Sequence, residues 1–128
     1  MILGVPIHHT KADLEEIQSL DLEEIVRDKA KKAFKLISKP LFVDDVGLYI
    51  KAWNEFPGPF IKYLLEAVGN AGLLRMMKDE TNREIIAKAA IGFHNGKEVL
   101  CFTGEVKGTL AKEPRGGGGW GWDPVFIP

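Results

Sequence analysis

The sequence has few of the features that would place it outside ordinary globular proteins. Its single cysteine, Cys101, excludes an internal disulfide and a zinc site built from cysteines. The 18 acidic and 17 basic residues nearly cancel, so no broad cationic surface is expected to grip nucleic acid or an anionic membrane. No apolar run approaches the roughly 20 residues of a membrane-spanning helix. We therefore expect no membrane or nucleic-acid partner and a reducing compartment, the cytoplasm.

The chain is long enough for one domain and too short for two. Of its 128 residues, 45% are hydrophobic and 27% are charged, a composition that can bury a core. No internal repeat or linker divides it, and the glycine run 116–119 is its one low-complexity segment. We predict a single domain over residues 1–128.

Hydrophobic patterns predict helices placed between strands. Apolar residues at 2–7 favour a short strand near a sheet edge or a bend. Apolar residues at helical spacing over 22–37 predict the most regular helix, with Asp21 as its N-cap. Clustered aromatic and β-branched residues then predict two strands, 40–45 and 46–53, separated by an acidic break.

The second half of the chain predicts one or two further helices and a hairpin. Helical spacing over 60–77 is interrupted at Gly69 and Asn70, a pair that commonly ends helices. Asn95 and Gly96 lie between two apolar runs, which is the pattern of a β-hairpin. The order of these elements predicts an α/β fold, a mixed β-sheet flanked by helices.

Two pairs of adjacent acids are candidates for a metal site. Asp44 and Asp45 directly follow an apolar strand, and open α/β sheets present ligand crevices at such ends. Adjacent carboxylates repel each other, so a nearby cation would stabilise them, and Mg²⁺ is typically held by one or two carboxylates plus substrate phosphates. The alternative for this pair is a solvated acidic turn. For Glu15 and Glu16 the alternative is a plain exposed surface.

Two lysines could supply the complementary charge. Lys29 lies on the polar side of the predicted helix, and Lys62 follows a Pro-Gly-Pro turn. Either could reach a phosphate group. The alternative is that both only keep the surface hydrated, as most lysines do.

The segment 114–124, PRGGGGWGWDP, combines a pliable backbone with flat aromatic side chains. Glycine permits close approach of a ligand, Trp120 and Trp122 offer stacking faces, and Asp123 can accept N–H bonds from a base edge. A heterocyclic base is therefore a candidate ligand. Two alternatives remain: both indoles belong to the core, or the segment binds RNA in the manner of an RGG motif.

The other reactive side chains form no catalytic pattern. His8, His9 and His94 show no metal-ligand spacing with one another or with the acids. There is no Ser-His-Asp order, no Walker loop and no dinucleotide-binding glycine pattern. Nucleophilic catalysis by a side chain thus has no support in the sequence.

Four segments taken in order resemble the inosine triphosphate pyrophosphatase family. They are LEEIQS, KAKKAF, LFVDDVGLYIKAWNEFPGPFIKYLLEAVGNAGLLRMM and GTLAKEPRGGGGWGWDPVFIP. The likeness covers nearly the whole chain from Asp13 onward. It implies the fold of that family and Mg²⁺-dependent hydrolysis of ITP, XTP and dITP to the monophosphate and pyrophosphate.

The resemblance also implies roles for the acids and lysines named above. Glu16 and Asp45 match the acids that serve the metal site, and they are therefore the expected catalytic residues. Lys29 and Lys62 match lysines that contact the triphosphate. Such an arrangement suits water attack on phosphorus, which needs charge neutralisation and in-line positioning rather than a protein nucleophile.

For the base, the resemblance points to the C-terminal segment. Trp120 takes the place of a stacking aromatic, and Trp122 with Asp123 matches the GWDP or GYDP that lines the purine pocket. A 6-keto purine would be selected because a 6-amino base leaves polar partners in such a pocket unpaired. Members of the family are typically dimers, so a homodimer is expected.

The chain departs from the family pattern in three places. It begins after the family's first strand and phosphate loop, and it ends before a Ser-His-Arg segment that contacts the substrate. Val46 stands where the family usually has Ser or Thr. We therefore expect a shortened member of the family, and the alternative function is that of a non-catalytic nucleotide-binding remnant.

Overall fold

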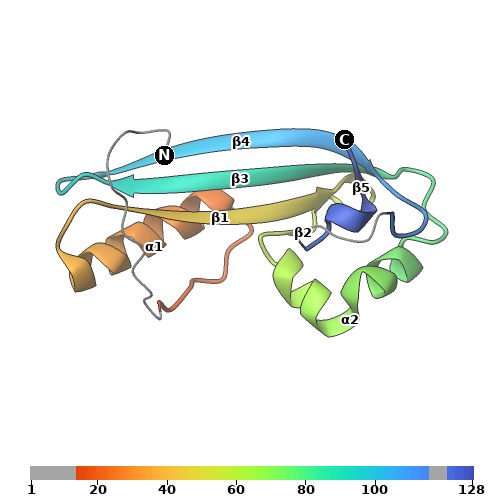
Figure 1. Ribbon diagram of the computed structural model, residues 1–128, viewed down its shortest axis with the longest axis horizontal. Coiled ribbons are helices and arrows are strands. Elements are labelled where there is room, and N and C mark those ends of the chain that lie inside the picture. The colour runs from red at the N-terminus through yellow and green to blue at the C-terminus, as the bar shows by residue number, and fades with distance from the viewer. Residues whose placement is uncertain (1–13, 116–120) are drawn as a thin grey trace.

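Three long strands run along the molecule in the computed structural model, which describes residues 14–115 and 121–128 (Figure 1). The helices are α1 (Leu22–Ile37), α2 (Ile61–Met76) and the short 3-10 helices η1 (Lys51–Trp53) and η2 (Asp123–Val125). The strands are β1 (Leu41–Ile50), β2 (Pro57–Gly58), β3 (Glu84–His94), β4 (Val99–Leu110) and β5 (Phe126–Ile127). They form one sheet in the order β2-β1-β3-β4-β5.

The sheet is flanked by helices as predicted, but its described strands pair only in antiparallel fashion. No parallel pairing, which a mixed sheet requires, occurs within residues 14–115 and 121–128. The strand predicted at residues 2–7 lies outside the described residues. No helix in the described part of the chain is long and apolar enough to cross a membrane.

Helix α1 forms where the sequence predicts it. The Asp21 carboxylate accepts a hydrogen bond of 3.0 Å from the Glu23 backbone N–H, so the predicted N-cap is confirmed. Leu22, Val26 and Ala30 are buried along one side of the helix. Helical spacing of apolar residues therefore places α1 against the sheet.

The predicted acidic break between two strands is wrong, because β1 is continuous through Asp44 and Asp45. Asp44 pairs with Ile91 and Asp45 with Ala90 of β3, so the ladder offsets the poor strand propensity of aspartate. Successive side chains of a strand point to opposite faces. Asp44 is accordingly exposed and Asp45 is half-buried. The two aspartates therefore lie in the middle of β1 rather than at the end of a strand.

The predicted hairpin joins β3 to β4. The Asn95 side-chain oxygen accepts hydrogen bonds from the backbone N–H groups of Lys97 (2.8 Å) and Glu98 (2.9 Å). Gly96 has a φ of 99°, a conformation that favours glycine. The hairpin prediction is confirmed, and its strands are paired from one end to the other.

Helix α2 bends sharply at the predicted helix-ending signal. Gly69 has φ 68° and ψ 179°, so the helix is two shorter segments meeting at this residue. The first segment begins at Ile61 and has no side-chain N-cap. The second turns back toward the sheet, where Leu73 and Met77 are buried.

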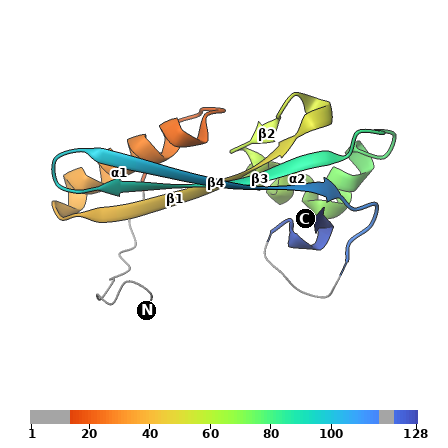
Figure 2. The same cartoon turned by 90° about the horizontal axis from the view of Figure 1, so that it is seen from above.

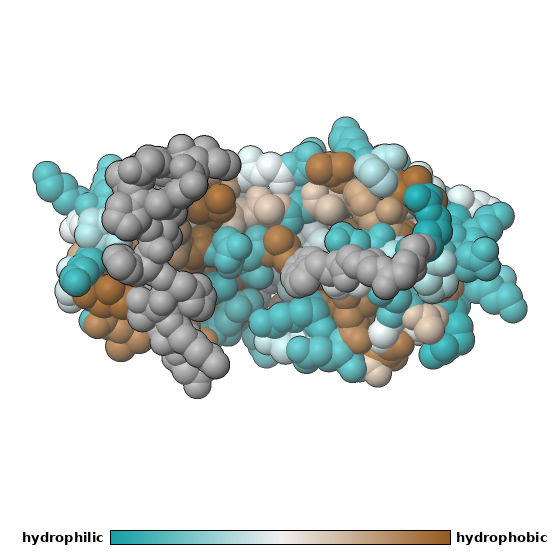
Figure 3. All heavy atoms as spheres, in the orientation of Figure 1, coloured by the Kyte–Doolittle hydropathy of each residue, from teal (hydrophilic) through white to brown (hydrophobic). Residues whose placement is uncertain are grey.

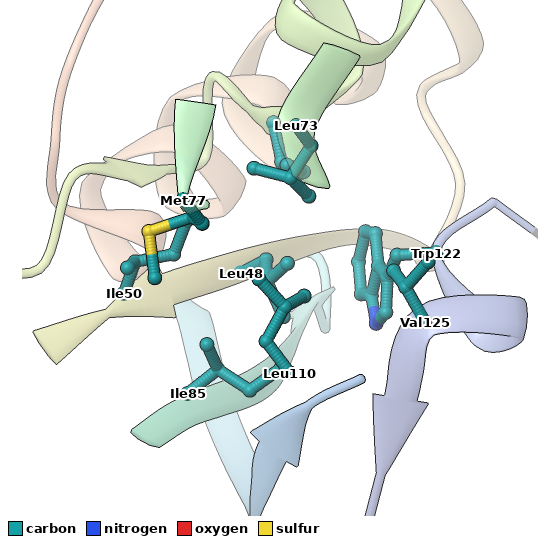
Figure 4. Close-up of a cluster of buried hydrophobic side chains, with 9 residues drawn as sticks. Leu48, Ile50, Leu73, Met77, Ile85, Leu110, Trp122 and Val125 are labelled. Carbon is teal, nitrogen blue, oxygen red and sulfur yellow. The ribbon is translucent and has the colours of Figure 1, made fainter. Parts of the chain in front are cut away.

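Each helix covers a different face of the sheet at a different end. Leu22 and Val26 of α1 pack with Ala90 and with partly buried Val43. The larger core lies at the α2 end and is shown in Figure 4: Leu48, Ile50, Ile61, Leu73, Met77, Ile85, Leu110, Trp122 and Val125. Positions 43 and 48 of β1 differ in parity and so face opposite ways. Figure 1 shows both helices beyond the β1 edge of the sheet, α1 at one end and α2 at the other, and Figure 2 shows the same two ends from above.

Candidate functional site

Four charged side chains from four separate segments meet beside β1. Glu16 precedes α1, Lys29 lies within α1, Asp45 lies in β1 and Lys62 is in the first turn of α2. The Glu16 Oε2 atom is 3.9 Å from Lys29 Nζ and 3.7 Å from Lys62 Nζ. We call these residues the charged cluster. Polar surface gathers in the middle of the face shown in Figure 3, between the ends that carry α1 and α2.

Asp45 has the most unusual environment in the charged cluster. Its Oδ1 accepts a hydrogen bond of 3.0 Å from the Val46 N–H, whereas its Oδ2 is buried and accepts none from the residues that the structure describes. Burial raises the pKa of Asp45, the nearby Glu16 carboxylate raises it further, and Lys29 and Lys62 lower it. An oxygen that is buried, negatively charged and without a partner is suited to a cation or a ligand proton.

The two lysines of the charged cluster are held differently. Lys29 Nζ donates a hydrogen bond of 2.9 Å to the Asp44 carbonyl, on the edge of β1 that faces away from β3. Its side chain is 19% exposed, so its ammonium group is fixed. The side chain of Lys62 is 50% exposed, and its Nζ lies 5.0 Å from the ring centroid of Tyr63. Lys62 can therefore turn toward a ligand, and the uncapped N-terminus of α2 beside it also favours an anion.

Two glycines bring β2 against β1 close to Asp45. A Cβ on Gly47 would lie 2.9 Å from the Gly58 carbonyl carbon, and one on Gly58 would lie 2.9 Å from the Tyr49 ring. Burial raises the pKa of the Tyr49 hydroxyl to about 12, and the carboxylates of Asp21 and Asp45 add to the shift. The Tyr49 ring thus packs firmly between the backbone segments that position Asp45 and α2.

Tyr49 also borders a groove of about 680 Å³. The groove runs from the first turn of α1 across the sheet and is lined by Leu20, Asp21, Leu22, Glu23, Tyr49, Lys88, Thr103, Gly104 and Glu105. The Lys88 ammonium lies 4.5 Å from the centroid of the Tyr49 ring and 3.9 Å from Glu105 Oε2. Lys88 is therefore loosely paired with Glu105 on this side of the sheet.

The charged cluster provides two carboxylates for a metal. In the described part of the chain, no three or more His, Cys, Asp or Glu side chains are grouped so that they could hold an ion by themselves. Mg²⁺ needs only one or two protein carboxylates when substrate phosphates and water complete its shell. The buried Oδ2 of Asp45 and the nearby Glu16 carboxylate are hard oxygen donors of that kind. The residues present therefore fit Mg²⁺ bound together with a phosphorylated ligand.

The aromatic part of the predicted site differs from the charged cluster in how its side chains are buried. Trp122 is 6% exposed and belongs to the larger core, as the alternative interpretation of this indole has it (Figure 4). Asp123 is exposed and begins η2. Trp120 lies outside the described residues. The roles of these three residues in binding a base stay predictions.

Two residues for which the sequence indicated no such role, Asn70 and Arg83, join backbone segments that are distant along the chain. Asn70 Nδ2 donates a hydrogen bond of 2.9 Å to the Gly121 carbonyl. Arg83 donates to the carbonyls of Met77 (2.9 Å), Leu110 (3.1 Å) and Ala111 (2.9 Å). Gly69-Asn70 signalled only the end of a helix, and nothing local to Arg83 indicates three backbone acceptors.

Comparison with known proteins gives consistent matches. The model of the Ham1 family matches residues 2–128. A dITP/XTP pyrophosphatase of Methanopyrus kandleri is 39% identical over 126 residues, which cover 98% of this chain and 67% of that protein. One from Thermococcus kodakarensis is 40% identical over 126 residues, covering 98% of this chain and 68% of the relative.

Solved structures show the same fold. A HAM1 protein from Coxiella burnetii superposes with a TM-score of 0.81 at 30% identity, over 90% of this chain and 63% of that one. A nucleoside-triphosphatase described as a dITP/XTP pyrophosphatase, from Mycobacterium abscessus, superposes with a TM-score of 0.76 at 24% identity, over 99% of this chain and 69% of its own. The present chain spans about two thirds of the length of these proteins.

Proposed function

The chain belongs to the Ham1 family, and on that premise we propose that it hydrolyses non-canonical purine nucleoside triphosphates to the monophosphate and pyrophosphate. The relatives named dITP/XTP pyrophosphatase point to dITP and XTP, and ITP shares the 6-keto base. The observation that carries the proposal is the charged cluster. It gathers two carboxylates and two ammonium groups beside one strand.

The two lysines would bind the triphosphate. Glu16 shares one oxygen with both ammonium groups at 3.7 and 3.9 Å, which is longer than a hydrogen bond, so these ion pairs are loose. A phosphate can replace Glu16 as the partner of Lys62, whose side chain is half exposed. Lys29 stays anchored on the Asp44 carbonyl and adds a fixed positive charge.

Asp45 and Glu16 are the residues that would hold Mg²⁺. The ion, when bound, neutralises charge on the phosphates and on the pyrophosphate leaving group. Asp45 is suited to this role because Val46 fixes its Oδ1, while Oδ2 is buried with no hydrogen-bond partner among the described residues. No side chain has to attack phosphorus. Water attacks the α-phosphorus in line with the departing pyrophosphate, and the residues of the charged cluster supply position and charge.

The purine would be bound by the C-terminal segment. In this proposal Trp120 stacks on the base, and Trp122 and Asp123 line the pocket around it. The buried position of Trp122 supports a rigid wall, since its indole packs within the larger core. Selection of a 6-keto over a 6-amino purine would follow from polar groups left unpaired by the wrong base.

We further propose a cytoplasmic homodimer. The cytoplasm is the expected location of such an enzyme, because the nucleotide pool there includes damaged purines. Exposed apolar side chains on one face of the sheet support self-association, among them Phe42 at 53% and Phe102 at 58% exposure. Sedimentation of the purified chain measures its assembly directly, and a monomer at micromolar concentration would reject the dimer.

The function is tested by measuring product release with Mg²⁺ from ITP, XTP, dITP, ATP and GTP. We expect pyrophosphate and monophosphate from the first three at rates well above those from ATP and GTP, and no release without a divalent cation. Equal rates for all five would reject the purine selectivity. Nucleotide binding without pyrophosphate would favour a non-catalytic family remnant, and salt-sensitive affinity for RNA without nucleotide affinity would favour an RNA-binding segment.

A further inference from the structure

Asn70 joins two parts of the chain that the proposed function uses for different purposes. Its Nδ2 atom donates a hydrogen bond of 2.9 Å to the Gly121 carbonyl, 51 residues away in sequence. Gly121 stands between Trp120 and Trp122, the two indoles of the proposed base pocket. Its φ of 54° is a left-handed conformation that an L side chain would strain. The contact therefore holds the backbone directly before Trp122.

The bend in α2 places Asn70 for this contact. Gly69, with φ 68° and ψ 179°, interrupts the helix one residue earlier, so Asn70 does not continue the line of the first helical segment. That first segment carries Lys62 in its opening turn. Helix α2 thus carries a lysine of the charged cluster near its start and contacts Gly121 at its bend.

The side chain of Asn70 is poorly suited to a purely structural role. Its Oδ1 is buried and accepts no hydrogen bond from the part of the chain that the structure describes. A buried acceptor without a partner destabilises the fold. An apolar side chain at this position would avoid that penalty. The hydrogen bond from Asn70 Nδ2 to the Gly121 carbonyl therefore accounts for the amide at this position.

Other hydrogen bonds join the residues on the two sides of the C-terminal segment. The Ala111 N–H donates 2.8 Å to the Val125 carbonyl, and the Arg115 N–H donates 2.7 Å to the Pro124 carbonyl. These bonds close the segment at its ends and hold it on the sheet. Loss of the Asn70 contact would therefore leave these two hydrogen bonds in place while releasing Gly121 from α2.

We propose that Asn70 is a positioning residue for base recognition: through the Gly121 carbonyl it holds the backbone that leads into Trp122 and Asp123 relative to the phosphate-binding start of α2. The inference rests on the proposed function and names a residue that positions the groups proposed to bind the base. Asn70 itself need not touch the substrate.

The two halves of the substrate test this directly. Inosine monophosphate carries the base with one phosphate, and inorganic tripolyphosphate carries the phosphates with no base. Calorimetry with Mg²⁺ would compare both probes on the intact chain and on Asn70→Asp, which has the same shape but no donor. Asn70→Ala removes the donor without adding charge. Asn82→Asp is the matched control, because the Asn82 Oδ1 accepts a hydrogen bond from the Glu84 N–H and an aspartate keeps that acceptor.

We expect both Asn70 variants to bind inosine monophosphate about five- to tenfold more weakly, the loss of roughly one hydrogen bond. Tripolyphosphate affinity should stay within about twofold of the unchanged chain, and Asn82→Asp should match that chain for both probes. Equal weakening of both probes, no weakening of either, or no binding of inosine monophosphate to the unchanged chain would overturn the inference. A chain that releases no pyrophosphate from any nucleotide would refute the proposed function, while the contrast between the two probes would still decide the role of Asn70.

Discussion

The two halves of the proposed site are built in opposite ways. In the charged cluster, the side chains of Glu16, Lys29 and Lys62 are 19–50% exposed and are held by ion pairs of 3.7 and 3.9 Å. The aromatic half includes Trp122, which is 6% exposed and packs with Leu48, Leu73 and Val125 in the larger core. In the first half the residues are loosely paired with one another. In the second half a residue of the site is also a residue of the core.

In the charged cluster, the residues proposed to bind the ligand are not the ones that stabilise the fold. In the aromatic half, Trp122 is proposed to serve both purposes. Asp45 is held in a position that disfavours its own charge, so the ligand-binding role proposed for it comes at a cost to folding. Trp122 contributes apolar contacts that the fold needs whether or not a base is bound. Substitutions should therefore remove activity without unfolding in the charged cluster, and should remove both together around Trp122.

The largest effect is expected for Asp45→Asn. Loss of the carboxylate removes a proposed magnesium ligand, so pyrophosphate release from ITP should fall about a thousandfold, a magnitude typical of losing a group that stabilises transition-state charge. Asp44→Asn is the matched control, because the Asp44 side chain is exposed and only its backbone carbonyl meets Lys29. Comparable losses in both variants would show that the side-chain position of Asp45 is not special.

Trp122→Ala should cause the largest loss of stability. Removing a buried indole is expected to lower the free energy of unfolding by about 3–5 kcal/mol. Trp122→Phe keeps most of the apolar contact and should lose less. Chemical denaturation of the three proteins measures the difference. A Trp122→Ala protein as stable as the unchanged chain would place this indole outside the core and break the contrast between the halves.

Lys62→Met should reduce activity while leaving the fold intact. Loss of a charged hydrogen bond to phosphate predicts a fall in kcat/KM of roughly ten- to a hundredfold. The unfolding temperature should hardly change, since the side chain is 50% exposed and its ion pair with Glu16 is loose. Lys31→Met, on an exposed position of α1, controls for the lost charge. Unchanged kcat/KM in Lys62→Met would remove this lysine from the phosphate site.

The smallest effect concerns the stability of Asp45→Asn as pH changes. Burial raises the pKa of Asp45 above its ordinary 3.8, so the folded chain binds this proton more tightly than the unfolded chain. The ionised carboxylate therefore destabilises the fold above the folded pKa, and the penalty disappears as pH falls below 3.8. Asp45→Asn should be the more stable protein at neutral pH, with the difference shrinking toward pH 3 to 4. A constant difference across this range would argue against a raised pKa.

Local signals predicted much of the fold and little of its long-range pairing. The Asp21 N-cap, the Gly69 bend and the Asn95-Gly96 hairpin are each written in adjacent residues, and each is confirmed. The continuity of β1 through Asp45 was not predictable in that way, because its ladder partner Ala90 lies far along the chain. Local propensity favours a break there, and pairing with β3 overrides it.

The site shows the same limit. Residue type and family resemblance named Glu16, Lys29, Asp45 and Lys62, and the structure brings these four together. Neither signal could name Asn70, because its role depends on a backbone carbonyl 51 residues away. A polar residue beside a helix-breaking glycine resembles an ordinary cap until its tertiary partner is known.

Manganese binding followed by electron paramagnetic resonance tests the central claim most directly, because Mn²⁺ replaces Mg²⁺ at oxygen sites and reports its own binding. We predict that the unchanged chain binds one ion more tightly when inosine nucleotide is present, that Asp45→Asn and Glu16→Gln each lose this tight binding, and that Asp44→Asn keeps it. Tight, nucleotide-dependent Mn²⁺ binding that survives in both Asp45→Asn and Glu16→Gln would contradict the claim that these two carboxylates form one metal site.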